Sequence, residues 1–234
     1  MFVPVWDENP LRSIRFQWVT VGLIVVNVLV LLLQASGLSD QTIASFAIVP
    51  RELLHANLPM GTAVPVAAIV PVPERFTVLT YMFFHGDVIH LASNMVFLWV
   101  FGDNIEDCLG HARFLVFYLL CGIVAGLTHA WMQPASAIPL IGASGAVAGV
   151  VAAYIILHPR VRIWVLALKF VPLRLNALIV LGLWILTQLA MVMLPRNDAV
   201  AWWAHIGGLV AGAVLVIIMR RSGVPLFDKG LTSA

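Results

Sequence analysis

Four polar side chains interrupt stretches of the sequence that are otherwise apolar, and together their types are suited to serine-dependent hydrolysis. These side chains are His90, Asn94, Ser144 and His205. A serine hydroxyl becomes a nucleophile when a neighbouring histidine accepts its proton, and amide or imidazole N–H groups can stabilise the oxyanion that the attack creates. Polar side chains within an apolar helix are costly unless they are paired or functional. We therefore take these four residues as the candidates for chemistry.

The local sequence around Ser144 suits the stabilisation of negative charge. Ser144 stands in the motif Gly142–Gly145, where a loop gives way to a predicted helix. Unpaired backbone N–H groups and the positive end of the helix dipole lie at such a position. His90 and Asn94 are four residues apart, which puts both on one face of their predicted helix. These two side chains can thus point at a single target.

Two predicted helices carry small residues at a spacing of four. The two stripes are Gly145, Gly149 and Ala153 in one helix and Ala204, Gly208 and Gly212 in the other. Such stripes let two helix backbones approach closely. If they face each other, the Ser144 hydroxyl and the His205 ring come within hydrogen-bond distance. No aspartate or glutamate stands at this depth, apart from Asp87 and Asp198 near the surface, so we expect a Ser–His pair with no acidic third member.

The elements that must position these residues are membrane helices. The chain has 234 residues, of which 62% are hydrophobic and only 10% are charged, and its mean hydropathy is +1.01. Because about 20 apolar residues cross a bilayer, six candidate helices can be placed, at Phe16–Leu33, Asp87–Gly102, Ala112–Trp131, Ser144–Leu157, Leu175–Leu194 and Ala201–Met219. The sequence predicts an all-α, six-transmembrane-helix bundle over residues 16–219, with short tails at 1–15 and 220–234.

Basic residues set the expected orientation, since Lys and Arg gather in cytoplasmic loops. With the N-terminus inside, ten basic residues fall inside and three outside. The inside set is Arg12, Arg15, Arg113, Arg160, Arg162, Lys169, Arg174, Arg220, Arg221 and Lys229, and the outside set is Arg51, Arg75 and Arg196. We therefore expect both termini in the cytoplasm. The four candidate residues then share the outer part of the membrane.

The remaining segments support a membrane protein without adding a second site. The long connection 35–86 is rich in proline and apolar residues, so we expect parts of it at the membrane surface. Ile163–Leu168 is apolar but too short to span, and we expect it to lie on the surface as well. Cys108 falls in a short polar connection and Cys121 in an apolar stretch, which indicates neither a disulfide framework nor a metal site. The run Phe16–Leu33 is interpreted as a retained helix rather than a cleaved signal.

Three motifs together resemble the rhomboid intramembrane serine proteases. The motifs are His85 with His90-Leu91-Ala92-Ser93-Asn94, then Gly142-Ala143-Ser144-Gly145, and then Ala204-His205-Ile206-Gly207-Gly208. They occur in the family's order on the predicted second, fourth and sixth helices, and the six-helix core covers almost the entire chain. Many members also carry a Trp-Arg pair in the first outer loop, but here that loop contains no tryptophan.

The resemblance implies an intramembrane serine endopeptidase that cuts in or near the transmembrane segment of other proteins. It implies that Ser144 attacks the peptide carbonyl and that His205 takes and returns the proton. His90, Asn94 and the Ser144 backbone N–H would stabilise the oxyanion, with Gly142 in the same oxyanion and substrate-binding group. The fourth helix, at roughly 1.5 Å per residue over 14 residues, is too short to span, so its start should sit in a watered recess.

The sequence leaves two other functions as alternatives. The first is a catalytically silent relative that binds membrane clients, against which the intact Ser144 and His205 argue. The second is a small transporter, which needs polar positions that continue inward, whereas the inner halves of the fourth and sixth helices are apolar. We expect transmembrane substrates and membrane lipid as partners, no metal and no cofactor. The formal charge of +2 gives no indication of a nucleic-acid partner, and we expect a bacterial inner-membrane location.

Overall fold

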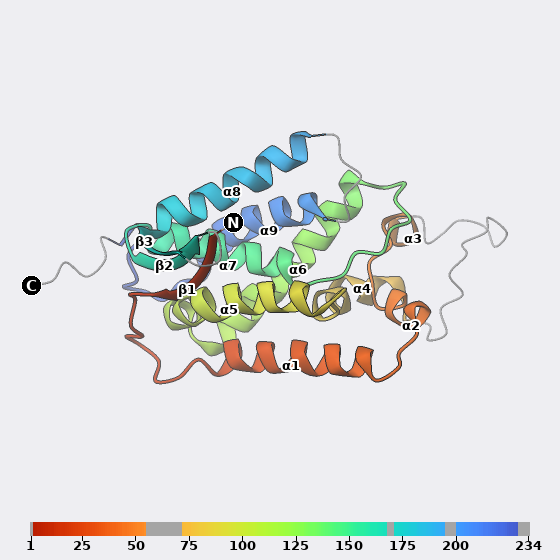
Figure 1. Cartoon of the computed structure of the whole chain (residues 1–234), viewed down its shortest axis with the longest axis horizontal. Helices are drawn as coiled ribbons and strands as arrows, with labels where there is room; N and C mark the ends of the chain where they lie inside the picture. The colour runs from red at the N-terminus through yellow and green to blue at the C-terminus, as the bar shows by residue number, and fades with distance from the viewer. Residues whose placement is uncertain (1, 55–71, 168–170, 195–199, 229–234) are drawn as a thin grey trace, which may run out of the picture.

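A bundle of apolar helices makes up most of the structure (Figure 1). The computed structural model describes residues 2–54, 72–167, 171–194 and 200–228. Within these ranges four helices are long and apolar enough to cross a membrane, α1 (Trp18–Ala35), α5 (Val88–Leu109), α6 (His111–Met132) and α9 (Trp202–Met219). Two shorter apolar helices accompany them, α7 (Ser144–Leu157) and α8 (Ala177–Met193). The predicted bundle of apolar membrane helices is therefore confirmed.

The connection between α1 and α5 folds into short helical pieces. These are α2 (Asp40–Ala44), α3 (Pro50–Leu54), α4 (Glu74–Thr80) and a 3-10 turn, η1 (Tyr81–Phe83). A single antiparallel bridge ties Ile48 to Leu140 in the segment before α7. Much of the apolar stretch that we expected at the membrane surface, residues 55–71, lies outside the described residues.

A small sheet closes the opposite end of the bundle from α2 and α3 (Figure 1). Its strands β1 (Phe2–Asp7), β2 (Arg162–Ala167) and β3 (Val171–Asn176) are antiparallel in the order β1-β2-β3. Of the segment Ile163–Leu168, which we expected on the membrane surface, residues 163–167 belong to β2 and Leu168 lies outside the described residues. Alternate residues of β2 point into the bundle, and Ile163 and Val165 are fully buried. The expected N-terminal tail supplies β1. The helix predicted from Leu175 begins only at α8, because β3 includes that residue.

The second membrane helix is longer than the sequence indicates. Its predicted end is Gly102, but α5 continues to Leu109, so Cys108 lies in its last turn rather than in a polar connection. Glu106 accepts two backbone N–H groups in the first turn of α1, at 3.0 and 2.8 Å. Asp107 accepts three backbone N–H groups from residues 12–14, at 2.7 to 3.0 Å. The carboxylates in the last turns of α5 thus cap the start of α1 and anchor the segment before it.

Helix α7 lies in the centre and carries the candidate nucleophile at its first residue. It packs against α5, α6 and α9, and every residue from Gly145 to Tyr154 is buried. Its 14 residues have the bounds that the sequence predicts. Helix α8 lies at the edge of the bundle (Figure 1), with Leu178, Leu183 and Leu186 exposed. A short buried helix thus positions the site, and a peripheral helix covers one side of it.

Candidate active site

The structure brings Ser144 and His205 into direct contact. Ser144 opens α7, and His205 lies in the first turn of α9. The His205 Nε2 atom lies 2.9 Å from the Ser144 Oγ atom, which is a normal hydrogen-bond length. His205 is 8% exposed and Ser144 is partly buried. An imidazole nitrogen at this distance can accept the serine proton.

The predicted small-residue stripes face each other and produce this contact. A Cβ added to Gly208 would overlap the carbonyl oxygen of Gly145, and one added to Gly212 would overlap that of Gly149. A Cβ on Gly145 would lie 3.5 Å from the Ala204 carbonyl oxygen. The two helix backbones are therefore in contact along two turns. This close approach brings the start of α9 beside the start of α7.

The second nitrogen of His205 contacts a residue that the sequence analysis missed. The His205 Nδ1 atom lies 2.8 Å from Oε1 of Gln188 on α8, and Gln188 is 4% exposed. Two tryptophan rings flank the imidazole, with centroid distances of 6.1 Å for Trp184 and 5.8 Å for Trp202. Gln188 is a polar residue in the middle of an apolar helix. The rule that singled out the other four residues would have found it as well.

His90 lies against the loop that precedes Ser144. Gly142 has φ +123°, and a Cβ there would lie 2.8 Å from the His90 Nε2 atom, so only glycine fits this approach. The Gly86 N–H points at the His90 Nδ1 atom from 3.5 Å. If Nδ1 is the acceptor, Nε2 carries the proton of the neutral ring. His90 then presents an N–H donor on the side of Gly142.

His85 holds the same loop through a hydrogen bond to its backbone. It is fully buried, and burial lowers the pKa of its imidazole to about 4, so the ring is neutral at physiological pH. Its Nε2 atom accepts the Ala143 N–H at 3.4 Å. Gln34 of α1 holds the His85 backbone through bonds to its carbonyl oxygen (2.9 Å) and its N–H (3.2 Å). The residue before the candidate nucleophile is thus held by a side chain that α1 positions.

Asn94, on α5, has a side-chain N–H donor that makes no hydrogen bond within the described part of the chain. The donor atom is Nδ2, and the residue is 6% exposed. An unpaired buried amide costs free energy, and this cost persists in proteins where a ligand or transition state completes the pairing. His90 and Asn94 are one turn apart on the same helix.

The described residues contain no group of three His, Cys, Asp or Glu side chains that could hold a metal ion.

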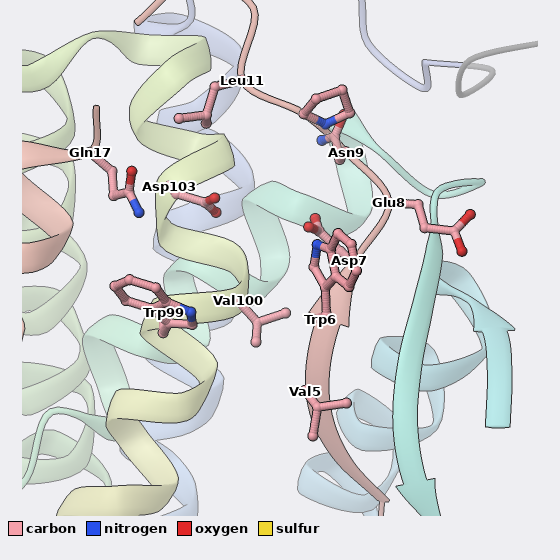
Figure 2. Close-up of a pocket in the computed structure, with 11 residues that line it drawn as sticks. Val5, Trp6, Asp7, Glu8, Asn9, Leu11, Gln17, Trp99, Val100 and Asp103 are labelled. Atoms are coloured by element: carbon pink, nitrogen blue, oxygen red, sulfur yellow. The ribbon is translucent and has the colours of Figure 1, made fainter. Parts of the chain in front are cut away.

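A cavity lies away from this site, toward the end of α7 opposite to Ser144. It has a volume of about 320 Å³ between β1 and α5, and Trp6, Asp7, Trp99 and Asp103 line it (Figure 2). Asp7 is 4% exposed and accepts hydrogen bonds from the Tyr154 hydroxyl and from Asn104 Nδ2, the latter at 3.0 Å. Burial raises the pKa of this carboxyl to about 7. The β1 strand is thereby tied to the helix that carries Ser144.

The apolar bundle and its site define the class of protein. Four spanning helices, with two shorter ones, make an integral, multi-pass membrane protein, and a serine and a histidine meet within it. The family model described as Rhomboid domain matches residues 73–222. The chain therefore belongs to the rhomboid family.

Relatives from three organisms are similar to this chain. RHOMBOID-like protein 12, mitochondrial, from Arabidopsis thaliana is 30% identical over 162 residues, which cover 62% of this chain and 46% of the relative. Rhomboid protein 1, mitochondrial, from Saccharomyces cerevisiae is 26% identical over 152 residues, or 61% and 41% of the two chains. Rhomboid protease GluP from Bacillus subtilis is 29% identical over 163 residues, or 69% and 29%. The chain thus spans about half the length of these relatives or less.

Two of these relatives are described as mitochondrial. The comparison therefore supports an integral membrane location but does not support the expected bacterial inner membrane over a mitochondrial membrane.

Proposed function

We propose that this chain is an intramembrane serine endopeptidase that hydrolyses a peptide bond in or near the transmembrane segment of other membrane proteins. The observation that carries the proposal is the 2.9 Å contact between Ser144 Oγ and His205 Nε2 inside an apolar bundle. The contact supports a base-activated nucleophile.

The proposed reaction proceeds through an acyl-enzyme. Ser144 Oγ attacks the substrate carbonyl carbon while its proton passes to His205 Nε2. His205 then returns this proton to the leaving amine, and the C–N bond breaks. A water molecule then gives a proton to His205 Nε2 and attacks the ester carbonyl; the bond to Ser144 Oγ breaks, His205 returns the proton to that oxygen, and the acid product is released. Each step needs only Ser144, His205 and water.

The oxyanion would be stabilised by donors from two elements. The first turn of α7 contributes backbone N–H groups that have no partner within their helix. On α5, the Nε2–H of His90 beside Gly142 and the unpaired Nδ2–H of Asn94 are the side-chain donors that we propose. Donors fixed in advance are effective because they need little reorganisation when charge develops.

The direct test is cleavage of a panel of single-pass membrane proteins by the purified protein. We expect Ser144→Ala and His205→Ala each to abolish cleavage, and the double variant to be no worse, because residues acting as one unit are strongly non-additive. Ser36→Ala, at an exposed position after α1, is the matched serine control and should cleave normally. A fluorophosphonate should label Ser144 only while His205 is present.

Cleavage that survives Ser144→Ala would remove the serine-protease assignment. Capture of membrane proteins by both the wild type and Ser144→Ala, with no cleavage and no labelling by either, would instead favour the silent client-binding function. The bacterial inner-membrane location stays a prediction, and fractionation of the source cells tests it.

A further inference from the structure

Helix α8 supplies the hydrogen-bond partner of the candidate base. We infer that Gln188 is a positioning residue whose side-chain oxygen accepts the Nδ1–H of His205, and so holds His205 in the tautomer that can take the Ser144 proton. The inference rests on the proposed function, and it adds a third member to the Ser144–His205 pair. Its geometric basis is the 2.8 Å separation between Gln188 Oε1 and His205 Nδ1.

The orientation of the Gln188 amide follows from its other contacts. Its Nε2 atom lies 2.9 Å from the backbone oxygen of Trp184, which can only accept. The amide nitrogen must therefore face Trp184, and the amide oxygen must face His205. The Thr187 hydroxyl strengthens this assignment, because it lies 3.0 Å from the same nitrogen and donates to the same Trp184 oxygen at 2.6 Å. A flipped amide would place two acceptors together.

The donor and acceptor in both hydrogen bonds of His205 are then determined. Since Gln188 Oε1 only accepts, the His205 Nδ1 atom must carry a proton. In the neutral ring the Nε2 atom is then the acceptor, and it faces the Ser144 hydroxyl at 2.9 Å. The opposite tautomer would leave Gln188 Oε1 facing a lone pair and would offer Ser144 no base. Gln188 gains and loses no proton during the reaction.

Gln188 also matters once His205 is charged. When Nε2 takes the serine proton, both ring nitrogens carry hydrogen, and Nδ1–H continues to donate to Gln188 Oε1. The amide dipole thus stabilises the imidazolium without placing a second full charge in an apolar site. Trp184 and Trp202 flank the ring, but an indole N–H only donates and cannot replace this acceptor.

The test replaces the acceptor while it keeps the shape of the side chain. Gln188→Met is nearly isosteric but cannot accept, so we expect kcat to fall on the order of tenfold to a hundredfold with KM within about twofold. Gln188→Glu keeps an oxygen facing His205, and its neutral form can donate its O–H to the Trp184 carbonyl in place of the amide N–H, so kcat should stay within a few-fold of wild type. Gln41→Met, on the exposed surface of α2, is the matched control and should be unchanged.

A spectroscopic measurement separates positioning from packing and does not require cleavage. With ¹⁵N-labelled histidine, wild-type His205 should show a protonated Nδ1 and an unprotonated Nε2. Gln188→Met should show a mixture of tautomers, and Gln188→Glu should not. If Gln188→Met does not fold, Gln188→Asn replaces it, because its oxygen is one methylene too short to reach His205.

The outcomes are distinguishable. Wild-type kcat and an unmixed tautomer in a folded Gln188→Met protein would overturn the inference and leave the proposed function intact. Cleavage that survives Ser144→Ala would overturn the proposed function, while the tautomer measurement would still decide the role of Gln188.

Discussion

The contact between the α7 and α9 backbones should control the Ser144–His205 distance, and Gly208→Ala tests this directly. The new methyl group would overlap the Gly145 carbonyl oxygen and would lie 3.3 Å from the Ala148 Cβ atom. A carbon and a carbonyl oxygen need about 3.3–3.6 Å between them. The two helices must therefore separate by roughly an ångström or more at this point.

Such a separation has a large expected effect on the site. Gly145 adjoins Ser144 in the sequence, and Gly208 lies one turn after His205, so the shift is transmitted to both residues. A hydrogen bond of 2.9 Å would lengthen to about 4 Å, which is no longer a bond. Loss of general-base catalysis costs about a hundredfold to ten-thousandfold in rate. Overpacking should lower the free energy of unfolding by about 1–3 kcal/mol.

The assay combines fluorophosphonate labelling of Ser144, cleavage rate and melting temperature in detergent. Gly212→Ala creates the same type of overlap two turns after His205, so it should lower the melting temperature similarly but reduce labelling less. Gly182→Ala on α8 has nothing within 4 Å of the added methyl group and should change neither quantity. A folded Gly208→Ala protein that is labelled at the wild-type rate would refute the reasoning.

Further predictions concern other parts of the molecule. Replacing both His90 and Asn94 with Ala should lower kcat by about a hundredfold or more with little change in KM, and a near wild-type kcat in the folded double variant would exclude both from the mechanism. Cleavage should fall on acidification as His205 becomes protonated, whereas a rate that rises steadily toward acid would contradict its role as base. Because the raised pKa of Asp7, about 7, lies above its value in the unfolded chain, its contribution to stability is lost as pH rises. Between pH 6 and 8 the free energy of unfolding of the wild type should therefore fall by about 1.4 kcal/mol relative to that of Asp7→Asn. The readout is the melting temperature of both proteins as a function of pH. Reporter fusions at the two ends should both score as cytoplasmic.

The sequence alone was sufficient to predict the membrane bundle, the helix that begins at Ser144, and the contact between the two glycine stripes. Apolar runs of adequate length require helices in a bilayer, because backbone polar groups there must be satisfied within their own segment. The helix over Ser144–Leu157 was predicted to the residue, since a loop motif precedes it and a polar turn follows it. The facing of the two glycine stripes was also foreseeable, because only small residues permit such an approach.

Only the tertiary structure decided how the polar residues outside the predicted spans are used. Glu106 and Asp107 resemble loop residues by type, yet they lie in α5, and their carboxylates bind backbone N–H groups more than 80 positions earlier in the chain. Residues 163–167 of the apolar segment pair with β1 (Phe2–Asp7) as part of strand β2, and no local pattern encodes that pairing.

The partner of the second His205 nitrogen was likewise revealed only by the tertiary structure. Gln188 lies 17 positions before His205 on a different helix, and its polarity marked it as unusual without indicating what it contacts. The serine and histidine could be paired from sequence because two periodic stripes implied one helix contact. The direction in which the Gln188 amide points depends on the Trp184 carbonyl one turn earlier in α8 and on how α8 packs beside α9. Short-range sequence patterns do not specify the contact between these two helices.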